Sequence, residues 1–140
     1  MDKSKEYIEM CRKATEIQDK WIPGEGDYIC EVGYNNKDFV DIISLHDCCG
    51  GDMCDMPKFN YSQEELCVAI FLPRQDQLQG MLTKEYIDSF AMLADLYRYC
   101  IKEDFLLEDL FYGNETMEIL WLMFVMKEEY NKTWNGTDWL

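Results

Sequence analysis

The chain has 140 residues, of which 48% are apolar, so wholesale disorder is excluded and we expect a single domain spanning residues 1–140. The formal net charge of −15 opposes direct binding to nucleic acid or to an anionic membrane. The longest apolar run, Ile119 to Met126, is too short to span a bilayer, and the charged N-terminus lacks a signal-peptide core, so we expect a cytoplasmic protein.

The first half of the chain predicts a helix followed by a β-hairpin. Residues 3–20 carry an apolar stripe at helical spacing. Its members are Tyr7, Met10, Cys11, Ala14, Ile17 and Trp21. Residues 27–34 and 38–46 are rich in β-forming residues, and the "NNK" between them is typical of a turn. Residues 47–66 are expected to form a loop.

The middle of the chain predicts a strand that runs directly into a short helix. Residues 67–72, "CVAIFL", are apolar throughout, which is typical of a strand covered on both faces. Pro73 suits the first turn of a helix over 75–82, with Leu78 facing inward. We therefore interpret "LPRQDQLQ" as a junction between strand and helix, at which Arg74 and its neighbouring glutamines tolerate substitution if exposed.

Two longer helices are predicted toward the C-terminus. The first, over 84–102 with Thr83 as N-cap, has one apolar stripe that we expect to face the core. This stripe comprises Tyr86, Phe90, Leu93, Ala94, Tyr97 and Ile101. The second, over 115–130 and capped by Asn114 or Thr116, is apolar on two sides, so it lies either in the core or at an oligomer interface.

The fold class that follows is α+β. We expect a small antiparallel sheet of about three to five strands, an N-terminal helix and two longer C-terminal helices that cover the sheet. Asn135-Gly136 predicts a final hairpin between Trp134 and Trp139.

One cluster has the residue types of a metal site. His46, Cys48, Cys49 and Cys54 lie within nine residues and could hold a tetrahedral zinc ion, the one cofactor that the sequence suggests. The spacing departs from paired C-x2-C knuckles, and adjacent cysteines point in different directions, so Cys30 or Cys67 could complete the site instead. The alternative is a loop of reduced thiols.

The sequence offers no recognisable catalytic set, and we expect a protein that is not an enzyme. His46 is the only histidine, and no G-x-S-x-G motif accompanies it. Adjacent carboxylates such as Glu64 and Glu65 diverge on a helix and suit a solvated face. Phosphate-binding glycine loops are also missing from the sequence.

The acidic residues concentrate in residues 21–60 and 101–120. They predict attraction to a partner with a basic surface, although improved solubility alone is the simpler explanation. The candidate partner-binding residues are Glu25, Asp27, Glu31, Asp38, Asp41, Asp47, Asp52, Asp55, Glu103, Asp104, Glu108 and Asp109.

Three segments carry a resemblance to a known group. They are "EYIEMCRKATEIQDKWIPGEGDYI", "IFLPRQDQLQGML" and "TMEILWLMFVMKEEYNKTWNGTDWL". In this order they resemble small uncharacterised proteins encoded by phages and prophages of Gram-positive bacteria. The resemblance leaves residues 35–63 uncovered and transfers no catalytic residue. It implies a setting, the bacterial cytoplasm during infection or lysogeny.

Three functional hypotheses follow. The first is a non-enzymatic accessory protein that binds and inhibits a host protein, for example a nucleic-acid-handling defence factor such as a CRISPR effector. The second is a structural or regulatory phage protein that forms a homo-oligomer through Trp121, Phe124 and their neighbours. The third is a small zinc-binding or thiol-based module around His46.

Overall fold

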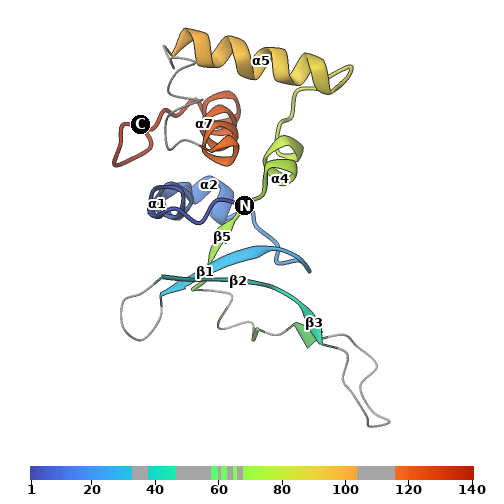
Figure 1. Cartoon of the computed structure of the whole chain (residues 1–140), viewed down its shortest axis with the longest axis vertical. Coiled ribbons are helices and arrows are strands. Elements are labelled where there is room, and N and C mark those ends of the chain that lie inside the picture. Colours follow the sequence, from blue (N-terminus) through green and yellow to red (C-terminus); the bar gives the residue numbers. More distant parts are fainter. Residues whose placement is uncertain (33–37, 47–57, 60, 63–64, 66–67, 104–115) are drawn as a thin grey trace.

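The computed structural model describes residues 1–32, 38–46, 58–59, 61–62, 65, 68–103 and 116–140. Helices gather on one side of a small antiparallel sheet (Figure 1). This arrangement confirms the expected α+β class. In chain order the elements are α1 (Lys5–Lys13), α2 (Thr15–Gln18), β1 (Tyr28–Val32), β2 (Asp38–Ile42), β3 (Leu45–His46), β4 (Lys58–Phe59), β5 (Ile70–Leu72), α4 (Gln75–Gly80), α5 (Ser89–Lys102) and α7 (Met117–Tyr130).

The N-terminal helix forms as two pieces. Ser4 caps α1 by accepting a hydrogen bond from the Tyr7 backbone N–H, and α1 ends at Ala14, whose ψ of 64° is not helical. The chain then resumes as the single turn α2. The predicted stripe is confirmed from Tyr7 to Ile17, since all its members in that range are buried in the core.

The predicted hairpin is also confirmed, and β1 lies at the centre of the sheet. The strand order is β2-β1-β5, with Tyr28 opposite both Ile42 and Leu72 in antiparallel register. A second, two-stranded sheet pairs β3 with β4. The strand β5 has three residues rather than the six expected.

The Gln18 side chain closes the outer edge of β5. Its amide oxygen accepts the Phe71 N–H at 2.9 Å, and its amide nitrogen donates to the Phe71 carbonyl at 3.0 Å. One side chain therefore makes both bonds that a neighbouring strand would make. An unprotected edge would be free to pair with another chain, and Gln18 prevents this at Phe71.

The strand-to-helix junction forms as expected at residues 72–78. Leu72 and Leu78 are fully buried, and α4 begins two residues after Pro73. The Tyr7 hydroxyl donates to the Pro73 carbonyl, which ties the junction to α1. Burial raises the pKa of Tyr7, so the hydroxyl stays protonated and remains a donor.

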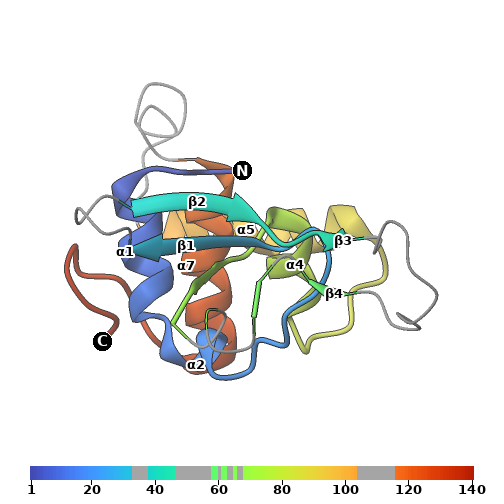
Figure 2. The ribbon, with the colours of Figure 1, turned by 90° about the horizontal axis from the view of Figure 1, so that it is seen from below.

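The helix α7 lies in the core rather than at an oligomer interface. Every residue from Ile119 to Met126 is buried, because α1, α4 and α5 pack around it (Figures 1 and 2). Trp121 and Phe124 are therefore packed inside the chain and are not on its surface. Thr116 is the N-cap, and Asn131 ends the helix with a φ of 54°. No helix in the described ranges is long and apolar enough to cross a membrane.

The prediction for α5 is wrong in two respects. The helix begins at Ser89 because Asp88 caps it, accepting from the Ala91 N–H at 2.8 Å, whereas Thr83 donates to the Glu129 carboxylate instead. The expected core stripe is also mostly exposed: Phe90, Leu93, Tyr97 and Ile101 face solvent, and Tyr86 and Ala94 are half-buried. The opposite face, with Leu96, Tyr99 and Cys100, packs against α7.

The C-terminal hairpin is confirmed by the bridge between Trp134 and Trp139. The Asn135 side chain accepts from the backbone N–H groups of Thr137 and Asp138, and Gly136 supplies the positive φ of 93° at the turn. Trp139 Nε1 donates to the Met10 carbonyl at 3.0 Å. The hairpin thus returns to α1 and covers its outer side.

Leu78 tests the junction. We expect Leu78→Ala to lower the free energy of unfolding by about 2–5 kcal/mol, because the side chain is fully buried between α4 and α7. Gln79→Ala is the matched control and should change it by less than about 0.5 kcal/mol. Urea unfolding measures both. Equal midpoints for the two variants would contradict the packing.

Candidate functional site

A buried carboxylate organises the turn between α2 and β1. Asp27 is 6% exposed and accepts three hydrogen bonds. Trp21 Nε1 donates at 2.8 Å, the Gly24 N–H at 2.9 Å and Gln77 Nε2 at 2.6 Å. Asp27 therefore does not lie on the exposed acidic surface where we expected it. Its carboxylate is instead a structural acceptor for the turn.

Gln77 and Arg74 join this turn to α4. The Gln77 amide oxygen accepts the Arg74 N–H at 2.9 Å, while its amide nitrogen donates to Asp27. Arg74 Nη1 donates to the Gly26 carbonyl at 2.6 Å, and Asp76 pairs with the same guanidinium. Arg74 is thus half-buried and bound, so the exposure on which its tolerance of substitution depended is not met. The segment "LPRQDQLQ" therefore connects the turn before β1 to the start of α4. We call the hydrogen bonds among Asp27, Arg74 and Gln77 the buried joint.

A pocket of about 550 Å³ opens beside this joint. Its wall includes Trp21 and Phe71, whose rings stack at 5.0 Å, and Met81 and Tyr130. The size falls in the range of small-molecule sites, roughly 300–1,000 Å³. The polar groups of Asp27 and the neighbouring amide are already bonded within the protein. The pocket suits an apolar group, and at its rim the Thr83 hydroxyl donates to the Glu129 carboxylate at 3.2 Å.

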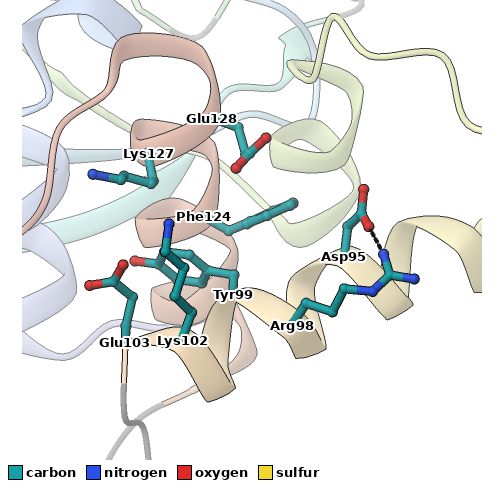
Figure 3. Close-up of a pocket in the computed structure, with 8 residues that line it drawn as sticks. All are labelled: Asp95, Arg98, Tyr99, Lys102, Glu103, Phe124, Lys127 and Glu128. Atoms are coloured by element: carbon teal, nitrogen blue, oxygen red, sulfur yellow. Dashed lines mark hydrogen bonds and ion pairs between the residues drawn. The ribbon is translucent and has the colours of Figure 1, made fainter.

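A second pocket, of about 250 Å³, lies between α5 and α7 (Figure 3). Its walls combine three basic and three acidic side chains with two aromatic rings. They are Arg98, Lys102, Lys127, Asp95, Glu103, Glu128, Tyr99 and Phe124. The charges balance, and Arg98 pairs with Asp95. Glu103, one of the candidate partner-binding acids, therefore lies in a pocket whose acidic and basic side chains are equal in number.

Three other carboxylates gather on the sheet face that is turned away from the core. Cys30 and Val40 pair across β1 and β2 and pack in the core, so strand alternation turns Glu31 and Asp41 to the other face. They are diagonal neighbours there. Glu65 interacts electrostatically with Glu31 and joins the group. We call Glu31, Asp41 and Glu65 the acidic sheet cluster.

Hydrogen bonds keep two members of this cluster ionised. The Tyr61 hydroxyl donates to Asp41 at 2.5 Å and lowers the pKa of that carboxyl. The Ser62 hydroxyl and N–H donate to Glu65, each at 2.7 Å, and lower its pKa. Burial and then repulsion from these two acids raise the pKa of Glu31. The cluster therefore holds at least two fixed negative charges.

The other predicted partner-binding acids are distributed as follows. Glu25 is exposed in the turn before β1. Asp38 opens β2. Asp47, Asp52, Asp55, Asp104, Glu108 and Asp109 lie outside the described residues. The sequence indicated the acidic character of β1 and β2, but it did not single out Glu65 or Tyr61, whose proximity depends on the fold.

The zinc hypothesis stays a prediction. His46 belongs to β3, while Cys48, Cys49 and Cys54 lie outside the described residues. Within the described ranges, no three histidine, cysteine or acidic side chains come together as metal ligands. Cys30, the alternative ligand, is buried in the core.

Comparison of the chain with protein-family models, curated proteins and solved structures gives no match. The functional interpretation therefore rests on the geometry above and on the resemblance of the three sequence segments. Two of those segments contain Asp27 and Gln77, which are hydrogen-bonded to each other at the buried joint. These two side chains therefore have a structural role.

Asp27 tests the joint. Asp27→Ala leaves three donors without their acceptor, so we expect the free energy of unfolding to fall by about 2–4 kcal/mol. Glu25→Ala removes an exposed carboxylate two residues away and should change stability by less than about 0.5 kcal/mol. Thermal unfolding of both variants measures the difference. An Asp27→Ala protein as stable as the wild type would contradict the stabilising role of these hydrogen bonds.

Glu31 tests the acidic sheet cluster. A raised pKa means that the folded state binds this proton more tightly than the unfolded chain does, so stability falls as the pH rises through the folded-state pKa. Glu31→Gln should therefore stabilise the protein at pH 7 by ~0.2–1 kcal/mol. The gain should shrink as the pH falls toward about 4, near the ordinary glutamate pKa. A gain that is independent of pH, measured by urea unfolding, would contradict the electrostatic cause.

Proposed function

We propose that the chain is a non-enzymatic acidic accessory protein that binds a basic surface on another protein and inhibits it. The observation that carries the proposal is the acidic sheet cluster, in which Tyr61 and Ser62 hold Asp41 and Glu65 ionised beside Glu31. Keeping like charges together opposes folding stability, so their placement on the sheet face turned away from the core, with Glu65 exposed, suits recognition of cations.

The setting and the partner class rest on the sequence. The resemblance to phage and prophage proteins supports a bacterial host cell, and the net charge of −15 supports competition with a phosphate backbone. A host protein that handles nucleic acid, such as a CRISPR effector, presents the basic channel that this charge fits. We infer that the protein blocks such a channel without binding nucleic acid itself.

Charge reversal tests the proposal. The double variant Glu31→Lys/Glu65→Lys removes most of the negative charge of the cluster, and Asp19→Lys/Glu85→Lys changes the net charge equally at exposed sites elsewhere. In affinity capture from a bacterial host lysate at low salt, the wild type and the control should retain a basic nucleic-acid-binding protein. The cluster variant should lose it.

Salt provides the second readout. Binding should weaken steeply with added salt, because exposed charges are screened beyond about 8–10 Å at physiological ionic strength. The captured protein should also lose its own nucleic-acid binding when the acidic chain is added. Failure to capture a basic protein at either salt, or equal capture by both charge variants, would refute the proposal.

A further inference from the structure

The outer face of α5 carries an unpaired apolar stripe. Ile87 is 98% exposed, Phe90 80%, Ile101 58%, Tyr97 52% and Leu93 44%. From Phe90 onward the spacing of three or four residues places these side chains along one side of the helix. We call these five residues the α5 stripe. No other residue in the described part of the chain covers it. Single exposed apolar residues are common on protein surfaces, but a contiguous row of five is unusual for a surface that contacts only water.

The opposite, inner face of α5 packs against α7 within the monomer. Leu96, Tyr99 and Cys100 are buried, and the Tyr99 ring lies 5.5 Å from the Phe124 ring of α7. The helix is therefore apolar on two sides, and the fold uses one. Such a second face is typical of a helix that also contacts a partner.

The charge around the stripe favours a second copy of this chain as that partner. Residues 84–102 contain three basic and three acidic side chains, so they contribute nothing to the net charge of −15. Asp95 pairs with both Lys84 and Arg98. Two copies can therefore meet here with little like-charge repulsion, whereas the acidic sheet cluster would oppose self-association.

The area of the stripe is sufficient for a reversible dimer. Covering two aromatic and three aliphatic side chains at these exposures removes roughly 600–700 Å² per copy, since a buried aromatic residue accounts for about 150–250 Å². A standard interface buries about 800 Å² per partner. The stripe is therefore somewhat smaller than a standard interface, which suits a dimer that dissociates reversibly.

We propose that two copies form a symmetric dimer through antiparallel pairing of their α5 stripes. Ala94 lies midway between Ile87 and Ile101, and its small side chain permits close approach of the two helices at the two-fold axis. The antiparallel arrangement brings the exposed Arg98 of one copy to Phe90 of the other, a favourable cation–π pairing. Parallel pairing would instead set Arg98 against Arg98.

The dimer leaves the acidic sheet cluster free. Along the longest axis, which is vertical in Figure 1, α5 lies at the upper end of the molecule and the three-stranded sheet lies toward the lower end. Joining two copies through α5 therefore directs the two sheets away from each other. The assembly presents two acidic faces, which raises the effective affinity for a partner that offers two basic sites.

The test compares masses across protein concentrations by light scattering and sedimentation equilibrium. The wild type should rise from 16.7 kDa toward twice that mass. Phe90→Gln/Ile101→Gln should weaken association on the order of 100-fold or more, because each change occurs twice in the interface. Ile22→Gln/Val68→Gln, at two exposed apolar sites outside the α5 stripe, should leave it unchanged. Circular dichroism should show unaltered helix content in all variants.

Two outcomes would overturn the dimer. One is a wild type that stays monomeric at about 1 mM, where even a millimolar dimer forms. The other is a dimer that the Phe90→Gln/Ile101→Gln variant does not weaken. An unchanged dimer in Arg98→Gln would overturn the antiparallel arrangement. Added salt should not weaken the dimer, in contrast to partner binding, so failure of either proposal is recognised separately.

Discussion

The requirement to bury α7 on every side governs the arrangement of the other helices. Ile119 to Met126 is a continuous apolar run of more than two helical turns, so no face of this segment can be left in water. α1, α4 and α5 each cover part of it. The sheet lies beyond α1, which contacts β5, and Cys30 of β1 also packs in the core.

The second constraint is that short elements need side-chain bonds to fix their ends. β5 has three residues and α4 has six, and neither is stable by itself. Gln18 bonds both backbone groups of Phe71, and Asp27 together with Gln77 fixes the start of α4. These polar contacts replace the regular hydrogen bonds that longer elements would supply.

Sequence periodicity predicted most of the elements but not the orientation of α5. The helix carries Phe90 and Tyr97 on one side and Leu96 and Tyr99 on the other, and hydropathy ranks the first side at least as apolar. The orientation depends on which side matches the surface of α7, and this is a property of packing rather than of local sequence. For the same reason, the sequence marked Asp27 as acidic without revealing that the folded chain would bury it.

Charge and hydrophobicity are thus separated along the molecule, and this separation restricts how two copies can meet. Contact through the sheet would place Glu31, Asp41 and Glu65 against their own copies, and like charges at close range cost free energy. Contact through α5 doubles the net charge of the assembly but directs the acidic faces away from each other. At physiological ionic strength their repulsion is screened over about 8 Å, so the apolar contact at α5 is not opposed by the charge on the sheet.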